Sequence, residues 1–348
     1  MTAAGFPDAE PAESLDERYA ALADLRAAML EHDRVVLTTH VNADGDGAGS
    51  EVALAIHLRE NGVRPTIVNP TRFPESLRFM LGDLEAHRAS AAAGREALEK
   101  AGALVMLDTA EPQRIGAVAP YAERLPTLVI DHHPPAGPPI GDLAIRDPSA
   151  CATGELIYDL ITQSGKPPTP MQAQALYVAI ATDTGGFRFS NTTPRAHAIA
   201  AEMIGCGVRP EEMYRHLYGQ HTQERLALIR LALDNLKTDD EVPAAWISLR
   251  QADVMQTGAT TEDQEGLVEY PRRLKGVEIA LLIRELGPDR TKVSLRSNGA
   301  ANVARIAADL GGGGHEKAAG VLLREPFERA EIMVLSAVRD ALALADFA

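Results

Sequence analysis

The sequence predicts an α/β protein in which a parallel-sheet domain is followed by a smaller α/β domain. In the first half, short continuous apolar runs alternate with helical patterns, as they do where helices cover both faces of a parallel sheet. A second group of strand patterns begins near residue 243. With 348 residues, the chain is long enough to bury two cores of substantial size.

Four apolar runs are the expected strands of the first domain: residues 34–39, 64–69, 103–108 and 127–133. A helix is expected to begin at Ser14, because Ser14 and Glu17 have the spacing of a capping box. Another helix is expected over residues 47–62. The proline-rich residues 134–139 are expected to form a loop.

The remaining patterns give the expected domain boundaries. The first domain spans residues 14–192, after a disordered segment of residues 1–13 that is rich in Pro, Ala and acidic residues. Residues 193–240 are mostly helical in pattern and form a connector. The second domain covers residues 241–348, with strands at 244–250, 277–285 and 291–297 and helices at 302–310 and 325–345.

The composition excludes several classes of protein. A net charge of −15 and an aromatic content of 4% argue against binding along long nucleic acid, which requires basic surface and aromatic platforms. No window approaches the roughly 18 apolar residues of a membrane span. The N-terminus lacks a secretory pattern, and Cys151 and Cys206 form no disulfide framework, so a cytoplasmic location is expected. A small anionic substrate held by metal ions remains compatible with the charge.

Carboxylate and imidazole side chains follow the ends of the expected strands. They are His40, Asp44, Asp46, Asp108, Asp131, His132 and His133, and Asp183 follows the helical pattern of residues 171–182. Because the carboxyl ends of parallel strands lie along one edge of a sheet, we expect these side chains to converge. Oxygen and nitrogen ligands in this number, without sulfur, suit two Mn²⁺ or Mg²⁺ ions better than a structural zinc. Gly45, Gly47 and Gly49 are expected to let a turn approach the ions closely.

Other interpretations of these residues fit less well. The stretch "NADGDG" resembles the start of a calcium-binding loop, but Ala53 stands at the twelfth position, where a bidentate Glu is required. A Ser-His-Asp triad would need a G-x-S-x-G elbow, which the sequence lacks. Cys151 in "DPSACATGE" is a candidate thiol nucleophile, and the simpler interpretation is a small residue packed at the start of a helix.

Six stretches together resemble a known family. "HVNADGDG", "MLDTAE", "IDHHPP" and "ATDTGGFRFSNT" are similar, in this order, to the four motifs of the DHH phosphoesterase superfamily. "KVSLRSNG" and "GGGGHEKAAG" resemble its DHH-associated domain. Among the branches, "EGLVEYPRRLKGVEIALLIRE" with "GGGGH" looks most like the NrnA-type nanoRNases. That branch hydrolyses very short RNA to mononucleotides and adenosine 3′,5′-bisphosphate (PAP) to AMP.

The resemblance implies a role for each candidate residue. One divalent cation, most often Mn²⁺ and alternatively Mg²⁺, would take His40, Asp44 and Asp108. A second would take Asp46, Asp108, His132 and Asp183, so that Asp108 bridges the two ions. Asp131 would orient a neighbouring histidine, and His133 would contact the scissile phosphate or the leaving group, with structural support as its alternative.

The resemblance also leaves alternatives open for the substrate. Short RNA or small nucleotides are the expected substrates, and a homodimer is left open. A phosphodiesterase for cyclic di-AMP or linear pApA is the first alternative. An inorganic pyrophosphatase or polyphosphatase and a non-catalytic nucleotide sensor are the others, although the complete ligand set argues against a sensor.

Two groups of residues in the second domain are candidates for substrate binding. "GGGGHEKAAG" is expected to open a helix whose N–H groups at Gly313 and Gly314 bind a phosphate, with a hydrogen bond from His315. The alternative is a tight turn with a structural histidine. Arg296, beside Ser297, is expected to bind a terminal phosphate as a fork, unless it is a surface arginine at a strand end. We expect the active site in a cleft between the domains, which would limit substrates to a few nucleotides.

Overall fold

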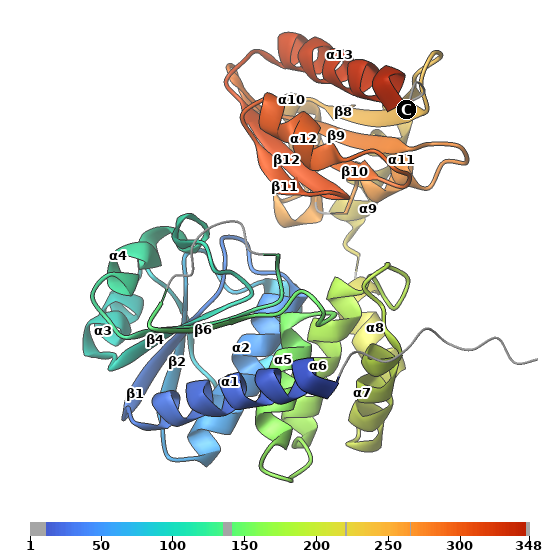
Figure 1. Ribbon diagram of the computed structural model, residues 1–348. Helices are drawn as coiled ribbons and strands as arrows, with labels where there is room; N and C mark the ends of the chain where they lie inside the picture. The colour runs from blue at the N-terminus through green and yellow to red at the C-terminus, as the bar shows by residue number, and fades with distance from the viewer. Residues whose placement is uncertain (1–11, 135–140, 220, 265, 346–348) are drawn as a thin grey trace, which may run out of the picture. The chain divides into compact units, whose positions relative to one another are not determined.

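The computed structural model describes residues 12–134, 141–219, 221–264 and 266–345 (Figure 1). The chain divides into two compact units, Met1–Gln220 and His221–Ala348. The segment expected as a connector is shared between them. Its helices α7 (Pro194–Gly205) and α8 (Pro210–Tyr218) belong to the first unit, and α9 (Gln223–Asp234) belongs to the second.

The first unit contains the expected parallel sheet. Its six strands are β1 (Arg34–Thr38), β2 (Arg64–Asn69), β3 (Ala86–Arg88), β4 (Ala103–Leu107), β5 (Thr127–Asp131) and β6 (Leu143–Arg146). They follow the order β3-β2-β1-β4-β5-β6, and every neighbouring pair is parallel. The strand order therefore reverses between β1 and β4, and sheets of this kind bind ligands at that point.

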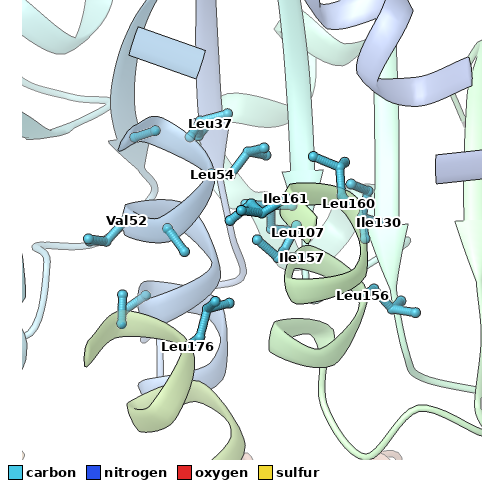
Figure 2. Close-up of a cluster of buried hydrophobic side chains, with 14 of the residues drawn as sticks. Leu37, Val52, Leu54, Leu107, Ile130, Leu156, Ile157, Leu160, Ile161 and Leu176 are labelled. Carbon is cyan, nitrogen blue, oxygen red and sulfur yellow. The ribbon is translucent and has the colours of Figure 1, made fainter. Parts of the chain in front are cut away.

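Helices cover both faces of this sheet, as predicted. One face packs on α1 (Ala12–Leu30), α2 (Gly45–Glu60), α5 (Thr153–Thr162), α6 (Pro170–Asp183) and the 3₁₀ helix η1 (Glu75–Met80). Figure 2 shows the centre of this core, where Leu37, Leu107 and Ile130 of the strands meet side chains of the helices. The other face packs on α3 (Ala92–Lys100), η2 (Pro112–Val118) and α4 (Ala119–Ala122). Alternate strand residues such as Val36 and Met106 fill that second layer.

Two helix starts differ from the sequence prediction. Helix α1 already includes Ala12, so Ser14 lies inside the helix and not at its start. Helix α2 begins at Gly45, because the Asp44 carboxylate caps it by accepting from the N–H groups of Asp46 and Gly47, both at 3.1 Å. The predictions for residues 1–11 and 135–140 fall outside the described residues.

The glycines of α2 lie in a helix and not in a turn, which corrects the expected role. A Cβ on Gly47 would lie 2.4 Å from Thr39 Oγ1, and one on Gly49 would lie 2.4 Å from the carbonyl oxygen of Ala175. These glycines therefore allow α2 to pack closely on the end of β1 and on α6.

The second unit is built on a mixed sheet. Its strands are β7 (Leu236–Thr238), β8 (Ala244–Leu249), β9 (Ile279–Gly287), β10 (Arg290–Ser297), β11 (Gly313–His315) and β12 (Ala318–Leu323). They follow the order β11-β12-β10-β9-β8-β7, in which only β8 and β9 pair in parallel. One face packs on α12 (Val303–Asp309) and α13 (Phe327–Ala345). The other packs on α9, α10 (Gln251–Gln256), η3 (Glu262–Gln264) and α11 (Glu269–Arg272).

The glycine run of the second unit forms a hairpin, so the expected helix at "GGGGHEKAAG" is wrong. Gly313–His315 pair antiparallel with Ala318–Gly320. Gly314 has φ +141°, and a Cβ there would lie 2.6 Å from the carbonyl oxygen of Ala318. The close approach of β11 and β12 thus excludes a side chain at position 314. Strand pairing therefore explains the glycine at this position. Across the described residues, no helix is both long and apolar enough to cross a bilayer.

Candidate active site

Asp46 is the most tightly held of the candidate ligands. Its side chain is 1% exposed. Oδ2 accepts from the N–H of Thr153 at 2.7 Å, and Oδ1 accepts from the N–H of Gly154 at 2.8 Å. These donors are the first residues of α5, so the N-terminus of one helix fixes the orientation of a carboxylate carried by another.

Asp108 occupies the end of β4, beside the point where the strand order reverses. Its backbone has φ +59°, a left-handed conformation that is costly for a residue other than glycine. The carboxylate is buried, and Oδ1 accepts from Thr153 Oγ1 at 3.2 Å. Its Oδ2 lies 3.2 Å from Nε2 of His40. The two oxygens of Asp108 therefore face different neighbours: Oδ1 faces Thr153, and Oδ2 faces His40.

His132 presents a ring nitrogen to three carboxylates. Its Nδ1 lies 3.4 Å from the carbonyl oxygen of Ala150, which favours the tautomer with the proton on Nδ1. Within the described residues, its buried Nε2 has no hydrogen-bond partner. The carboxylate oxygens around Nε2 are those of Asp46 at 3.7 Å, Asp108 at 3.6 Å and Asp183 at 3.7 Å.

Asp183 is the last residue of α6 and is oriented by a side chain that the sequence analysis did not single out. Nδ2 of Asn191 donates to Asp183 Oδ2 at 3.0 Å and to the carbonyl oxygen of Cys151 at 2.8 Å. Burial and the charges of Asp108 and Asp44 raise the pKa of Asp183 to about 6, although His132 opposes this shift.

His40 and Asp44 form the outer part of the cluster. Nε2 of His40 lies 3.7 Å from Asp44 Oδ2. Burial alone would lower the pKa of His40, but its contacts with Asp108 and Asp44 outweigh burial and raise the pKa to about 10. Burial likewise opposes the ionised form of Asp44, but His40 and the two backbone donors lower its pKa to about 2.

The donors fall into three overlapping groups that could each hold a metal ion: His40, Asp44 and Asp108; Asp46, His132 and Asp183; and Asp108, His132 and His133. Without a cation the carboxylates repel one another. Burial and the charges of Asp108 and Asp183 raise the pKa of Asp46 well above its usual value. A divalent cation would remove this repulsion and satisfy Nε2 of His132, so the residues fit the predicted metal site.

Asp131 and His133 form a pair beside these groups. Nδ1 of His133 lies 2.7 Å from Asp131 Oδ1, and the N–H of His133 donates to the same oxygen at 3.1 Å. Burial alone would lower the pKa of His133, but Asp131 and Asp108 raise it. Asp131 is therefore the partner of His133 and not of His132.

Cys151 does not have the environment of a nucleophile. It is buried, and burial together with Glu155 raises the pKa of its thiol. Its backbone N–H donates to Glu155 Oε2 at 3.0 Å, just before the start of α5. The structure thus agrees with a small residue packed at a helix start.

The candidate substrate residues of the second unit lie on one row of its sheet. Arg296 of β10 and His315 of β11 both pair with Ala318 of β12. Arg296 is 31% exposed, and its Nε lies 3.9 Å from Glu269 Oε1. Ser297 is buried, and its Oγ donates to the carbonyl oxygen of Gly299 at 3.4 Å, so it supports the turn after β10.

Gly313 and Gly314 are exposed on the edge strand, next to this row. The expected hydrogen bond from the His315 side chain falls outside the described part of the structure.

Sequence reasoning missed the residues that contact the candidate ligands: Ala150, Thr153, Gly154 and Asn191. Three of them contribute backbone groups, which leave no chemical signature in the sequence. The signal that was available is the Thr-Gly pair in "DPSACATGE", because these residues open α5 after the short loop that follows β6.

Comparison with known proteins identifies both units. Residues 34–182 match the model of the DHH family N-terminal domain, and residues 229–345 match that of the DHHA1 domain. The chain is 32% identical to the bifunctional oligoribonuclease and PAP phosphatase NrnA of Thermus thermophilus, over 90% of this chain and 91% of the relative. It is 29% identical to the protein of the same name from Bacillus subtilis, over 83% and 89%. The resemblance predicted from the motifs is thereby confirmed.

Solved structures agree with this assignment. An exopolyphosphatase-related protein from Bacteroides fragilis superposes with a TM-score of 0.87 at 26% identity, covering 93% of this chain and 97% of that one. RecJ in complex with Mn²⁺ from Thermus thermophilus shares the fold, with a TM-score of 0.50 at 17% identity over 92% of this chain and 55% of that one.

Proposed function

Because the chain belongs to the DHH family, we propose that it is a metal-dependent phosphoesterase that hydrolyses short oligoribonucleotides to mononucleotides and adenosine 3′,5′-bisphosphate to AMP. The observation that carries this proposal is the set of overlapping donor groups that share Asp108 and His132 at the reversal of strand order. The substrate follows from relatives named oligoribonuclease and PAP phosphatase, which the chain matches over nearly their whole length.

We assign the ligands of two divalent cations as the family resemblance implied. His40, Asp44 and Asp108 would hold one ion, and Asp46, Asp108, His132 and Asp183 would hold the other. We propose Mn²⁺, with Mg²⁺ as the alternative, because the donors are carboxylates and imidazoles. When bound, the cations stabilise charge on the phosphoryl oxygens and lower the pKa of water.

The residues of the chain supply orientation and proton transfer. Backbone donors hold both oxygens of Asp46, which limits the directions in which that carboxylate can bind. The carbonyl of Ala150 leaves the lone pair of His132 on Nε2. Asp131 favours the protonated form of His133. We therefore assign His133 to a phosphate oxygen or to the leaving oxygen, which it would protonate.

We assign the second unit to recognition of the rest of the substrate. Arg296 would bind a phosphate that is not cleaved, since a guanidinium can donate two parallel hydrogen bonds to a phosphate. Gly313, Gly314 and His315 would border this phosphate from the edge strand β11, which β12 separates from β10. Ser297 would act indirectly, by holding the turn that follows Arg296.

A phosphodiesterase dedicated to cyclic di-AMP or linear pApA is not favoured, because the relatives reported above are named for oligoribonucleotides in general and for PAP. We place the activity in the cytoplasm, where the free thiols of Cys151 and Cys206 would remain reduced.

The test is a substrate panel with Mn²⁺ at fixed salt. Initial rates would be measured on RNA of two to about a dozen nucleotides, PAP, linear and cyclic dinucleotides, pyrophosphate and polyphosphate. The last two are included because of the exopolyphosphatase-related neighbour. We expect kcat/KM to fall as RNA lengthens, since a protein of net charge −15 offers little affinity for additional phosphates. Equal efficiency on dinucleotides and on RNA of many tens of nucleotides, or activity confined to polyphosphates, would contradict the proposal.

A further inference from the structure

The segment from Asp147 to Glu155, which joins β6 to α5, contacts or orients four of the proposed metal ligands. We call it the 147–155 segment. The carbonyl of Ala150 faces His132, and the carbonyl of Cys151 binds Asn191, which binds Asp183. The N–H groups of Thr153 and Gly154 hold Asp46, and the Thr153 hydroxyl donates to Asp108. The position of this segment therefore determines where these ligands point.

Arg18, which lies far from this segment in the sequence, holds the segment in place. Arg18 lies on α1, which packs against α5 and β6 (Figure 1). Its Nε lies 2.7 Å from Asp147 Oδ2, and its Nη2 donates to Ser149 Oγ at 2.8 Å. Its Nη1 lies 2.9 Å from Glu155 Oε1 and 3.3 Å from Asp159 Oδ2. One guanidinium thus holds both ends of the segment.

Glu155 links Arg18 to the backbone that precedes α5. One of its oxygens binds Arg18, while Oε2 accepts from the N–H of Cys151 at 3.0 Å. Nε of Arg195 lies 3.2 Å from Oε1 as well. The side chain of Arg18 is only 1% exposed and that of Glu155 is 2% exposed. Buried ion pairs of this kind cost solvation free energy, so their presence beside the proposed metal site favours a role in geometry over one in stability.

We propose that Arg18 is a positioning residue of the metal site, which fixes the 147–155 segment and thereby sets the affinity of the group Asp46, His132 and Asp183 for a divalent cation. The inference rests on the proposed function. Arg18 is not among the proposed metal ligands, and it would act through Glu155 and the backbone of Cys151.

The competing explanation is that Arg18 only anchors α1. That helix already has an apolar anchor, since Leu22, Leu25 and Met29 are buried in the core. Truncation of Leu22 would loosen α1 without removing any of the hydrogen bonds or ion pairs between Arg18 and the 147–155 segment. Leu22→Ala is therefore a matched control, because it lowers stability through the same helix.

The experiment titrates metal-free full-length protein with MnCl₂ by calorimetry and records Tm for each variant. Arg18→Met should weaken Mn²⁺ binding by roughly 10- to 100-fold, the usual effect of removing a group that orients metal ligands. Arg18→Lys should recover only part of this loss, because an ammonium cannot hold Asp147 and Glu155 together. Leu22→Ala should lower Tm and leave Mn²⁺ affinity within about twofold of the wild type.

Asp147→Asn keeps the inference testable if Arg18→Met does not fold, because Asp147 is the most exposed of the acidic Arg18 partners, at 20% against 2% for Glu155 and 1% for Asp159. It should weaken Mn²⁺ binding severalfold. Unchanged Mn²⁺ affinity in the folded Arg18 variants and in Asp147→Asn would overturn the inference. A wild-type protein that takes up no Mn²⁺ would overturn it together with the metal assignment. Normal uptake without hydrolysis of any substrate would overturn the proposed function alone.

Discussion

The proposed metal ligands of the first unit and the proposed phosphate-binding Arg296 of the second differ in burial and in how firmly they are held. Asp46 and Asp108 are buried, and backbone or hydroxyl donors fix their oxygens. Arg296 is partly exposed, and its Nη1 donates to the neighbouring carbonyl of Leu295 at 3.0 Å. Fixed donors suit ions, whose coordination distances vary little, whereas a partly exposed guanidinium on a flexible stem can follow a phosphate of variable position. The more rigid of the two regions is therefore the one at which we propose that the bond is cleaved.

The largest effect on activity is expected for a change at Asp108, which belongs to two of the donor groups. Asp108→Asn should lower kcat by roughly 10³-fold and reduce bound metal, because one carboxylate serves two donor groups. Asn is preferred to Ala because it tolerates the left-handed backbone at φ +59°. Rate and metal content would be measured on the same samples. Full metal content with near-normal kcat would refute the bridging role.

A smaller effect is expected one step away from the ligands. Asp131→Asn should lower kcat by about 10- to 100-fold while metal content stays normal, because Asp131 orients His133. The comparison with Asp108→Asn separates a proton-handling pair from a metal ligand. If Asp131→Asn loses as much metal as Asp108→Asn, His133 belongs to the metal site and our assignment must change.

In the second unit, replacement of Arg296 is expected to weaken substrate binding. Arg296→Ala should raise KM for phosphate-terminated substrates by roughly 30-fold, equivalent to about 2 kcal/mol for charge-assisted hydrogen bonds. Metal content should not change. Arg290→Ala is the matched control, because Arg290 begins the same strand and is exposed. Equal KM values for the two variants would remove Arg296 from the substrate site.

The smallest effect is expected for Glu269→Gln, which should lower KM and so strengthen substrate binding. Glu269 lies 3.9 Å from Arg296, and Glu269→Gln would free the arginine for phosphate. Because exposed ion pairs contribute about 0.2–1 kcal/mol, KM should fall by roughly 1.4- to 5-fold. Removing a carboxylate should therefore improve binding here, whereas removing the one at Asp108 should lower kcat by roughly 10³-fold. A rise in KM would show that Glu269 itself positions Arg296.

The sequence predicted the centre of the first sheet and the proposed ligands, because both depend on strong patterns. The runs that became β1, β2, β4 and β5 are continuously apolar, and the polar residues follow them directly. The structure brings His40, Asp46, Asp108, His132 and Asp183 together as expected, since parallel strands align their carboxyl ends. The assignment of individual ions to these residues stays a prediction.

The parts that were missed depend on contacts between distant residues. β3 and β6 have only three and four residues, too few for a reliable pattern. The glycines at Gly313 and Gly314 suit an anion-binding helix start as well as an edge strand, and only pairing with β12 decides between them. Ala150 orients His132 through a carbonyl group, which any residue could provide.

The crowding of carboxylates around His132 also has a consequence for the lifetime of the protein in a cell. A cation that binds only the folded chain would add about 2.7 kcal/mol of stability when its free concentration is 100 times its Kd. Metal starvation would remove this contribution and raise the fraction of chains open to proteases. The abundance of the enzyme would then follow the supply of its cation, so that scarcity lowers the number of molecules as well as the activity of each.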